Sequence, residues 1–139
     1  MTDTPESALS HVSLGTNDYP RAVAFYDAIL PTIGVYKIME EGQARAYGRG
    51  FPEFWVQQPF DEKPAAPANG VHVAFLAKSR LDVDEFYKAG IEAGAKDAGE
   101  PGPRPMYGEP YYGCFLIDPD GHKIEAMFWD ESVTDSSAA

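Results

Sequence analysis

The stretch HVSLGTNDYPRAVAFYDAIL, residues 11–30, decides the fold of this chain because a second version of it follows. At residues 72–91, 61 positions later, HVAFLAKSRLDVDEFYKAGI repeats the leading histidine and the aromatic pair of the first stretch. Each copy reads as a short apolar strand that opens with a histidine, a polar break, and a helix. A repeat of this length predicts two copies of one supersecondary unit.

The residues around the repeat predict one strand, one helix and three further strands in each copy. Asn17 or Asp18 is a suitable N-cap for the first helix, which begins at Pro20 and is stopped by Pro31. Ser79 and Asp82 resemble a capping box at the start of the second helix. Alternating apolar residues predict further strands at 35–39, 45–48, 54–58, 71–76, 111–117 and 123–129.

These elements predict an α+β fold of two tandem β-α-β-β-β modules. A chain of 139 residues has the length of one domain. We expect that domain at 9–129, with module one at 9–58, a linker at 59–70 and module two at 71–129, between flexible tails at 1–8 and 130–139. The strand around 96–98 is poorly defined, and the prolines of 99–110 argue against regular structure there.

Composition narrows the classes of partner and the cellular location. A formal net charge of −11 disfavours nucleic acid, although Arg45, Arg49 and Arg104 could form a local positive cluster. No apolar run is long enough for a membrane span, and the polar first residues do not resemble a secretory signal, so we expect a cytoplasmic protein. Cys114 is the only cysteine, and its apolar neighbours predict a buried structural residue.

Strand alternation predicts a polar set on the faces that point away from the helices. If Val12 and its equivalents pack against the helices, His11 and His72 project to the opposite side. The closing strands place Gln57 and Glu125 on the same side. We therefore expect these four side chains to converge if the modules pair about a pseudo-twofold axis.

This set has the chemistry of a metal site. Two imidazoles and a carboxylate suit zinc, nickel, cobalt, manganese or iron better than calcium. Glu125 lies in an apolar strand, where an unpaired carboxylate is costly, so a metal or a cation beside it is expected, with Lys123 as the structural alternative. Gln57 is either a ligand or a surface amide, and His122 is expected to be exposed and not a ligand.

The two histidine strands and the hairpin DPDGHKIE, residues 118–125, resemble the vicinal oxygen chelate superfamily of glyoxalases, bleomycin-resistance proteins and extradiol dioxygenases. The resemblance covers Leu9 to Trp129. It implies an incomplete barrel of paired modules around a divalent metal, with His11, His72 and Glu125 as ligands. It places Gln57 where the glyoxalase I lineage carries a fourth ligand. It also implies a homodimer, in which the site lies within one chain or across two.

Three functions remain open from this resemblance. In a glyoxalase-like lyase or isomerase, the metal chelates two substrate oxygens and Glu125 moves a proton. A metal-free protein of the bleomycin-resistance type would only sequester its small-molecule ligand. An extradiol Fe(II) dioxygenase usually has a further histidine beside the metal ligands for proton transfer, and Tyr107, Tyr111 or Tyr112 would have to replace it here. The expected pocket residues are Trp55, Tyr107, Tyr112 and Met127.

Overall fold

The computed structural model describes residues 7–133 and contains two β-α-β-β-β modules. Module one consists of β1 (Val12–Gly15), α1 (Tyr19–Ile29), a short 3-10 helix η1 (Leu30–Ile33), β2 (Tyr36–Glu40), β3 (Ala44–Gly48) and β4 (Phe54–Gln57). Module two consists of β5 (His72–Leu76), α2 (Arg80–Glu92), β6 (Lys96–Pro103), a 3-10 helix η2 (Pro105–Tyr107), β7 (Tyr111–Ile117) and β8 (Lys123–Trp129). The expected fold class is thereby confirmed.

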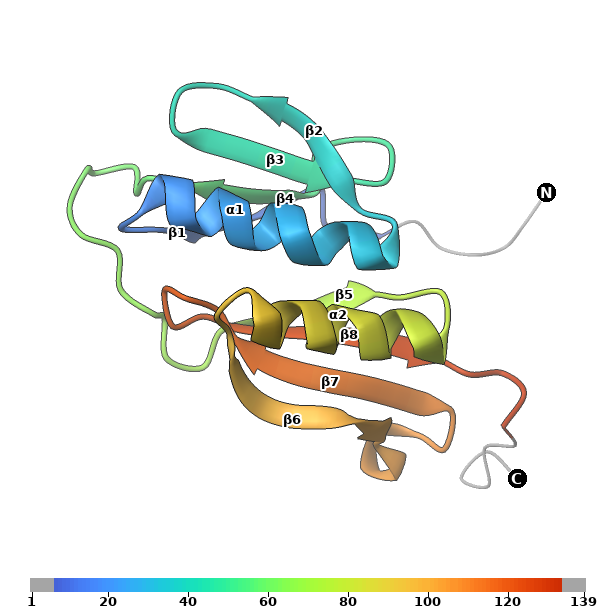
Figure 1. Cartoon of the computed structure of the whole chain (residues 1–139). Helices are drawn as coiled ribbons and strands as arrows, with labels where there is room; N and C mark the ends of the chain where they lie inside the picture. Colours follow the sequence, from blue (N-terminus) through green and yellow to red (C-terminus); the bar gives the residue numbers. More distant parts are fainter. Residues whose placement is uncertain (1–6, 134–139) are drawn as a thin grey trace.

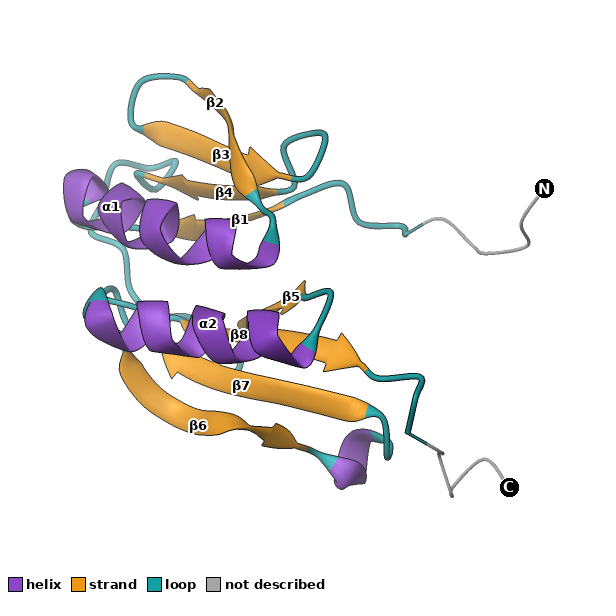
Figure 2. Ribbon diagram, turned by 45° about the vertical axis from the view of Figure 1, so that its right-hand side comes forward, coloured by secondary structure: helices purple, strands orange, loops and turns teal. Residues whose placement is uncertain are grey.

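Each module folds its strands into one open, four-stranded mixed sheet. The strand orders are β1-β4-β3-β2 and β5-β8-β7-β6, with the first pair parallel in each sheet. A helix lies against one face of each sheet, and α1 and α2 run side by side (Figures 1 and 2). The opposite face of each sheet is the face that the sequence assigned to the polar residues.

Both helices begin at the caps that the sequence predicts. Asp18 accepts a hydrogen bond from the backbone nitrogen of Arg21, and Ser79 accepts one from that of Asp82. Buried apolar side chains then face the sheets, and a left-handed Gly34 ends the 3-10 turn after α1. Local sequence therefore explains the helix limits.

One hydrophobic core runs through both modules. The ring centroids of Tyr26 and Phe54 lie 5.0 Å apart, and Phe54 lies 5.0 Å from Phe75 of the other module. Phe75 in turn lies 6.1 Å from Phe86 on α2. The first two contacts are edge-to-face, a geometry that stabilises beyond the area that it buries, so the modules form a single packed unit.

The turn Asp118–Gly121 joins module two to module one. The buried Asp118 accepts a 2.5 Å hydrogen bond from the Tyr26 hydroxyl, and Asp120 accepts one from Thr16. His122 Nε2 lies 2.7 Å from the carbonyl oxygen of Gly15. The expectation that His122 is exposed is wrong, because its side chain is 8% exposed and lies between the modules, where it contacts Gly15.

A second expectation is wrong for the segment after α2. Residues 96–103 form β6 despite their prolines, because the pairing with β7 is interrupted between Gly99 and Gly102, where Pro101 lies, and Pro103 stands at the end of the strand. Gly99 and Gly102 lie beneath the Arg104 guanidinium, whose nitrogens would be 3.3 Å from a Cβ added at either glycine. Irregular pairing therefore makes room for one arginine.

The linker and the chain ends differ in how far the structure describes them. Residues 59–70 contain no helix or strand, but Asn17 exchanges two hydrogen bonds with the Ala65 backbone and anchors this linker. Residues 130–133 follow β8, and Asp130 pairs with Arg80 at 2.8 Å. Of the expected flexible tails at 1–8 and 130–139, residues 1–6 and 134–139 lie outside the described residues.

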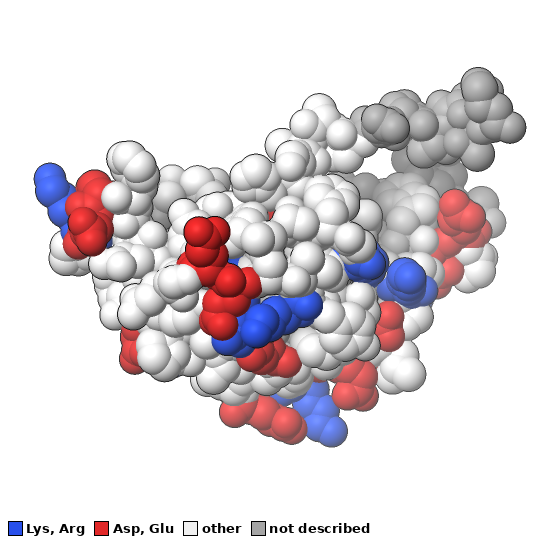
Figure 3. Space-filling view, turned by 90° about the horizontal axis from the view of Figure 1, so that it is seen from above, with Lys and Arg blue, Asp and Glu red and all other residues white. Residues whose placement is uncertain are grey.

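On the surface that Figure 3 shows, seen from above Figure 1 and therefore from the side of module one, many charges lie in neighbouring pairs of opposite sign. In Figure 3, red and blue atoms lie next to each other among wide uncharged areas. Arg45 pairs with Asp27 at 2.6 Å and with Glu40 at 2.7 Å, and Lys37 lies 3.7 Å from Glu40. Within the described residues, no helix combines the length and apolar character that a bilayer crossing requires.

Candidate functional site

Glu125 is the central titratable group on the open face of module two. Its neighbours Ile124 and Ala126 are fully buried against α2, so alternation turns Glu125 to the other face. There Glu125 is only 2% exposed. A carboxylate buried this deeply needs hydrogen bonds to both oxygens.

Two side chains from neighbouring strands supply those bonds. His72 Nε2 on β5 lies 3.1 Å from Glu125 Oε1, and the Tyr111 hydroxyl on β7 donates to Glu125 Oε2. Burial raises the pKa of Tyr111 well above its ordinary value, and the hydrogen bond to Glu125 is the second cause of this increase. Tyr111 therefore stays protonated as a donor, and the pair of bonds holds Glu125 in one orientation.

The geometry of His72 and Glu125 suits two neighbouring ligands of one metal. Metal–ligand bonds of about 2.0–2.2 Å separate adjacent ligand atoms by about 3.0–3.5 Å. The 3.1 Å between Nε2 and Oε1 falls in this range. These two residues therefore fit half of the expected ligand set.

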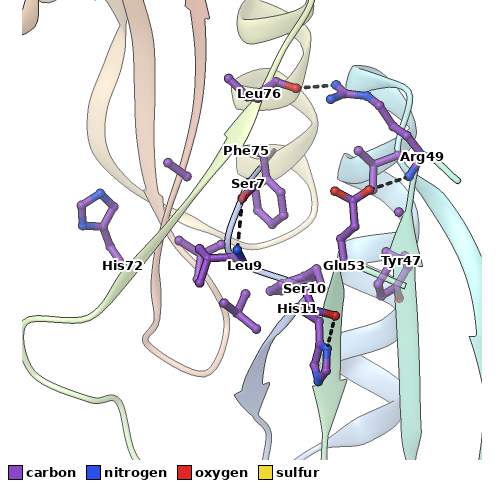
Figure 4. A pocket seen from close by; sticks show the side chains of 16 residues that line it. Ser7, Leu9, Ser10, His11, Tyr47, Arg49, Glu53, His72, Phe75 and Leu76 are labelled. Atoms are coloured by element: carbon purple, nitrogen blue, oxygen red, sulfur yellow. Dashed lines mark hydrogen bonds between the residues drawn. The ribbon is translucent and has the colours of Figure 1, made fainter. Parts of the chain in front are cut away.

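His11 does not join them. Its Nδ1 lies 2.9 Å from the Ser10 hydroxyl, and Figure 4 shows His11 and His72 projecting in different directions. Across the described range 7–133, no group of three or more histidine, cysteine, aspartate or glutamate residues is arranged to hold a metal ion. The described residues of one chain therefore bring two of the four expected ligands, His72 and Glu125, to a common point.

Gln57 also lies away from this point, and the strand register corrects the reasoning that selected it. Glu125 stands opposite Ala74, two residues after His72. In module one, the residue two positions after His11 is Ser13, which stands opposite Trp55. Gln57 pairs with Gly15, at the far end of β1. Trp55, which has no metal-binding group, therefore occupies the position equivalent to Glu125.

Glu53, which strand alternation does not single out, lies next to His11 in the strand register, and Figure 4 shows its carboxylate turned toward Arg49. The pairing of Val12 with Phe54 places Glu53 beside His11, and both line the same cleft. Glu53 Oε1 accepts a 3.1 Å hydrogen bond from the backbone nitrogen of Arg49. Strand alternation in the sequence selects Gln57 because of the face on which it lies. Only the parallel register, which is a tertiary property, shows that Glu53 is next to His11.

The four expected pocket residues lie in different surroundings. Met127 shares the open face of β8 with Glu125, and the Tyr107 ring lies 5.2 Å from that of Tyr111. The expectation that Tyr112 lines the pocket is wrong, because its hydroxyl donates to Asp84 on α2 at 2.7 Å and the side chain therefore faces the helix. Tyr111, its neighbour, has the parity of the open face. Trp55 lies on the open face of module one.

Two hollows meet at His72. A cleft of about 340 Å³ runs between the modules, and Leu9, His11, Glu53 and His72 are among its lining residues (Figure 4). A groove of about 440 Å³ lies between the linker and the start of β5 and β8, where His72 and Lys123 line it. His72 is thus open to solvent from two directions, whereas its partner Glu125 is enclosed.

The comparisons with known proteins agree with this architecture. A family model described as the Glyoxalase/Bleomycin resistance protein/Dioxygenase superfamily matches residues 8–126. A solved glyoxalase/bleomycin resistance protein from Albidiferax ferrireducens T118 is 35% identical, with a TM-score of 0.80 over 88% of this chain and 98% of that chain. A comparison with curated proteins found no match.

Two more distant solved structures share the fold. The fosfomycin resistance protein FosX from Listeria monocytogenes is 19% identical, with a TM-score of 0.63 over 92% of this chain and 98% of that chain. A lactoylglutathione lyase from Agrobacterium tumefaciens is 20% identical, with a TM-score of 0.62 over 90% of this chain and 96% of that chain. At these identities the likeness concerns the fold alone.

Proposed function

Because the chain belongs to the Glyoxalase/Bleomycin resistance protein/Dioxygenase superfamily, we propose that it is a metal-dependent lyase or isomerase of the glyoxalase type. The substrate is a small molecule with oxygens on adjacent carbons. The observation that carries this proposal is the enclosed Glu125 carboxylate, oriented by Tyr111 and adjacent to His72. A general base needs this combination of fixed position and limited hydration.

The chain's own residues divide the work between holding and moving a proton. Glu125 accepts the proton from the carbon beside a substrate carbonyl and returns it to the neighbouring atom. Tyr111 keeps the carboxylate aligned, because its raised pKa prevents its own ionisation. A divalent metal, when bound by His72 and Glu125, would polarise the substrate oxygens.

The third ligand in this proposal is His11 of the partner subunit. Each chain presents His72 with Glu125 on one module and His11 on the other, and the described residues of a single chain do not gather all three. A homodimer that pairs module one with module two of its partner would complete two equivalent sites. The homodimer is therefore part of the proposed function.

A subunit-mixing experiment tests this assignment. His11→Ala and His72→Ala should each reduce bound zinc or nickel, measured by mass spectrometry, to a small fraction of the wild-type content. Mixing the two variants after reversible dissociation should restore about a quarter of the sites, because half of the dimers are mixed and each carries one intact site. No recovery in verified mixed dimers would refute a site shared between subunits.

Proton transfer is tested by hydrogen exchange, which does not require the natural substrate. Dihydroxyacetone or glycolaldehyde is incubated with metal-loaded protein in D₂O, and loss of the C–H signal is followed by NMR. Glu125→Gln should abolish the catalysed exchange, and chelation should do the same until metal is restored. Wild-type exchange no faster than that of Glu125→Gln would contradict the proposal.

One observation favours sequestration as the second candidate. Trp55 occupies the position in module one equivalent to that of Glu125, and an aromatic surface suits a planar ligand better than it suits a metal. A sequestering protein would bind the same molecules with and without metal. Equal ligand affinity of the wild type and Glu125→Gln, without exchange in either, would favour this function.

A further inference from the structure

Four of the described strands form the edges of the two sheets, and β5 is the least protected of them. β1 and β5 are the inner edges, and β2 and β6 are the outer ones. Edge strands usually avoid pairing with other chains through charges, prolines, bulges or short length. β2 carries Lys37, Glu40 and a register shift, β6 carries prolines and two shifts, and β1 has four residues. β5, with the sequence HVAFL, has a regular ladder and none of these features.

The free edge of β5 presents backbone hydrogen-bonding groups at alternate residues. In a parallel ladder every second residue bonds to the neighbouring strand, and the residue between points its backbone groups away. The backbone nitrogen of Ala77 donates to a β8 carbonyl oxygen at 2.7 Å, so the odd-numbered residues face β8. The even-numbered residues His72, Ala74 and Leu76 therefore face the free edge. The Leu76 carbonyl confirms this direction, because it accepts a hydrogen bond from Arg49 of module one.

This edge borders the cleft of about 340 Å³ between the modules (Figure 4). All residues of β5 line the cleft. Val12, Val73 and Phe75 are half-buried there, and their side chains lie on the helix side of the sheets and form an apolar floor. The volume lies at the lower end of the range for ligand pockets. The cleft therefore admits a narrow, extended chain but not a second sheet.

Glu53 gives one end of the cleft a negative charge. Its Oε1 accepts the hydrogen bond from the Arg49 backbone nitrogen, and among residues 7–133 no donor bonds to its Oε2. The Arg49 guanidinium donates to the carbonyl oxygens of Ile33 and Leu76, so its donors are directed at backbone (Figure 4). An ammonium group is the ligand group that suits the open oxygen of Glu53.

The positive cluster expected from Arg45, Arg49 and Arg104 is not formed. Arg45 pairs with Asp27 at 2.6 Å, and Arg104 donates to the Glu100 carbonyl oxygen at 2.6 Å. Arg49 is therefore the single arginine or lysine among the described residues that line the cleft. The net charge of −11 adds to the preference for a cationic group in the cleft.

We propose that the free edge of β5 binds a short extended peptide in this cleft, with the amino terminus of the peptide at Glu53. The peptide pairs with β5 as an added antiparallel strand, because its amino terminus lies at the Leu76 end of β5. His72 and Ala74 exchange backbone hydrogen bonds with it, and its alternate side chains lie against the apolar floor. The imidazole of His72 stays directed at Glu125, so this site does not depend on the proposed function.

Peptide binding to metal-free protein tests the site independently of turnover. The probes are tetrapeptide amides X-Thr-X-Thr with a free amino terminus, in which X is valine, isoleucine, leucine or phenylalanine. Titrations are followed by NMR of ¹⁵N-labelled protein. The tightest probe should slow hydrogen exchange of the His72 and Ala74 amides at least about tenfold. Acetylation of its amino terminus should weaken binding about fivefold, and N-methylation of its backbone amides about tenfold.

Two proline variants form a matched pair. Ala74→Pro removes the N–H that faces the cleft but no bond of the β5–β8 ladder, and it should weaken the tightest probe about tenfold. Ser13→Pro makes the same change at the free edge of β1, and binding should be unchanged because Ser13 does not line the cleft. If Ala74→Pro does not fold, the exchange of the wild-type Ala74 amide decides the same point.

Glu53→Gln tests the position of the amino terminus. Glutamine keeps an oxygen for the Arg49 backbone nitrogen and removes the charge. This variant should weaken the probe with a free amino terminus about fivefold and leave the acetylated probe unchanged. Equal weakening of both probes would refute the contact between the ammonium group and Glu53.

Three results would overturn the peptide site. These are no binding of any probe, binding that leaves the His72 and Ala74 amides unprotected, and equal affinity of the N-methylated and unmodified probes. A folded Ala74→Pro variant with wild-type affinity would also overturn it. Absence of metal-dependent proton exchange would contradict the proposed function alone, because these measurements contain no metal.

Discussion

Asp118→Ala tests whether the DPDG turn joins the two modules. The Asp118 side chain accepts three hydrogen bonds in a site where it is 5% exposed. One comes from the Tyr26 hydroxyl at 2.5 Å, and two come from the backbone nitrogens of Asp120 and His122 at 2.9 Å. Alanine removes both acceptor oxygens, and with them all three hydrogen bonds, and leaves the Tyr26 hydroxyl buried without its partner.

The magnitude follows from these contacts. A hydrogen bond to a charged group contributes about 1.5–3 kcal/mol, and the two turn nitrogens can recover part of their loss through water. The buried Tyr26 hydroxyl cannot recover as easily, since Tyr26 is 1% exposed. We expect Asp118→Ala to lower the free energy of unfolding by about 3–5 kcal/mol.

Urea unfolding followed by circular dichroism measures this loss. Asp61→Ala is the matched control, because Asp61 accepts one backbone hydrogen bond in an exposed loop, and its loss should be below about 0.5 kcal/mol. Combining Asp118→Ala with Tyr26→Phe should give a coupling energy of about 1–3 kcal/mol. Asp118→Asn supplies a milder change if the alanine variant does not fold.

An Asp118→Ala variant as stable as Asp61→Ala would show that the Asp118 hydrogen bonds do not stabilise the fold. A double variant whose loss of stability equals the sum of the two single losses would mean that the Tyr26–Asp118 contact contributes nothing. In either case the turn would not couple the modules through this contact.

Three further predictions concern the core. Gly90→Ala should destabilise by about 1–3 kcal/mol in urea unfolding despite the helix propensity of alanine, since its Cβ would lie 2.3 Å from Leu116 Cδ1; a stabilised variant would contradict this packing. Burial raises the pKa of Cys114 to about 12, so a disulfide reagent at pH 8 should modify it only after urea is added, and rapid labelling of native protein would refute its enclosure. Burial also raises the pKa of Tyr26 and Tyr47, so their contribution to stability is complete below about pH 10 and is lost at higher pH; unfolding midpoints should fall from pH 10 to 11, less so in Tyr26→Phe, and a flat profile would exclude this linkage.

Much of the fold could be predicted from local sequence. The helix caps at Asp18 and Ser79 and the closing strand at Ile124 depend on neighbours within a few residues, and the internal repeat doubled each signal. β6 was missed because prolines lower strand propensity, whereas its irregular pairing with β7 depends on a distant strand. His122 was misjudged for the same reason, since its acceptor, Gly15, lies 107 residues away.

For the site, strand alternation placed His72 and Glu125 on one face, because a side-chain period of two residues is a local property. Register and the packing of the modules are not local, and they decided the rest. They set Trp55 instead of Gln57 opposite Ser13, and they separated His11 from the Glu125 carboxylate. They also left the edge of β5 free at the cleft between the modules, because backbone pairing between distant segments determines which strand edges stay unpaired.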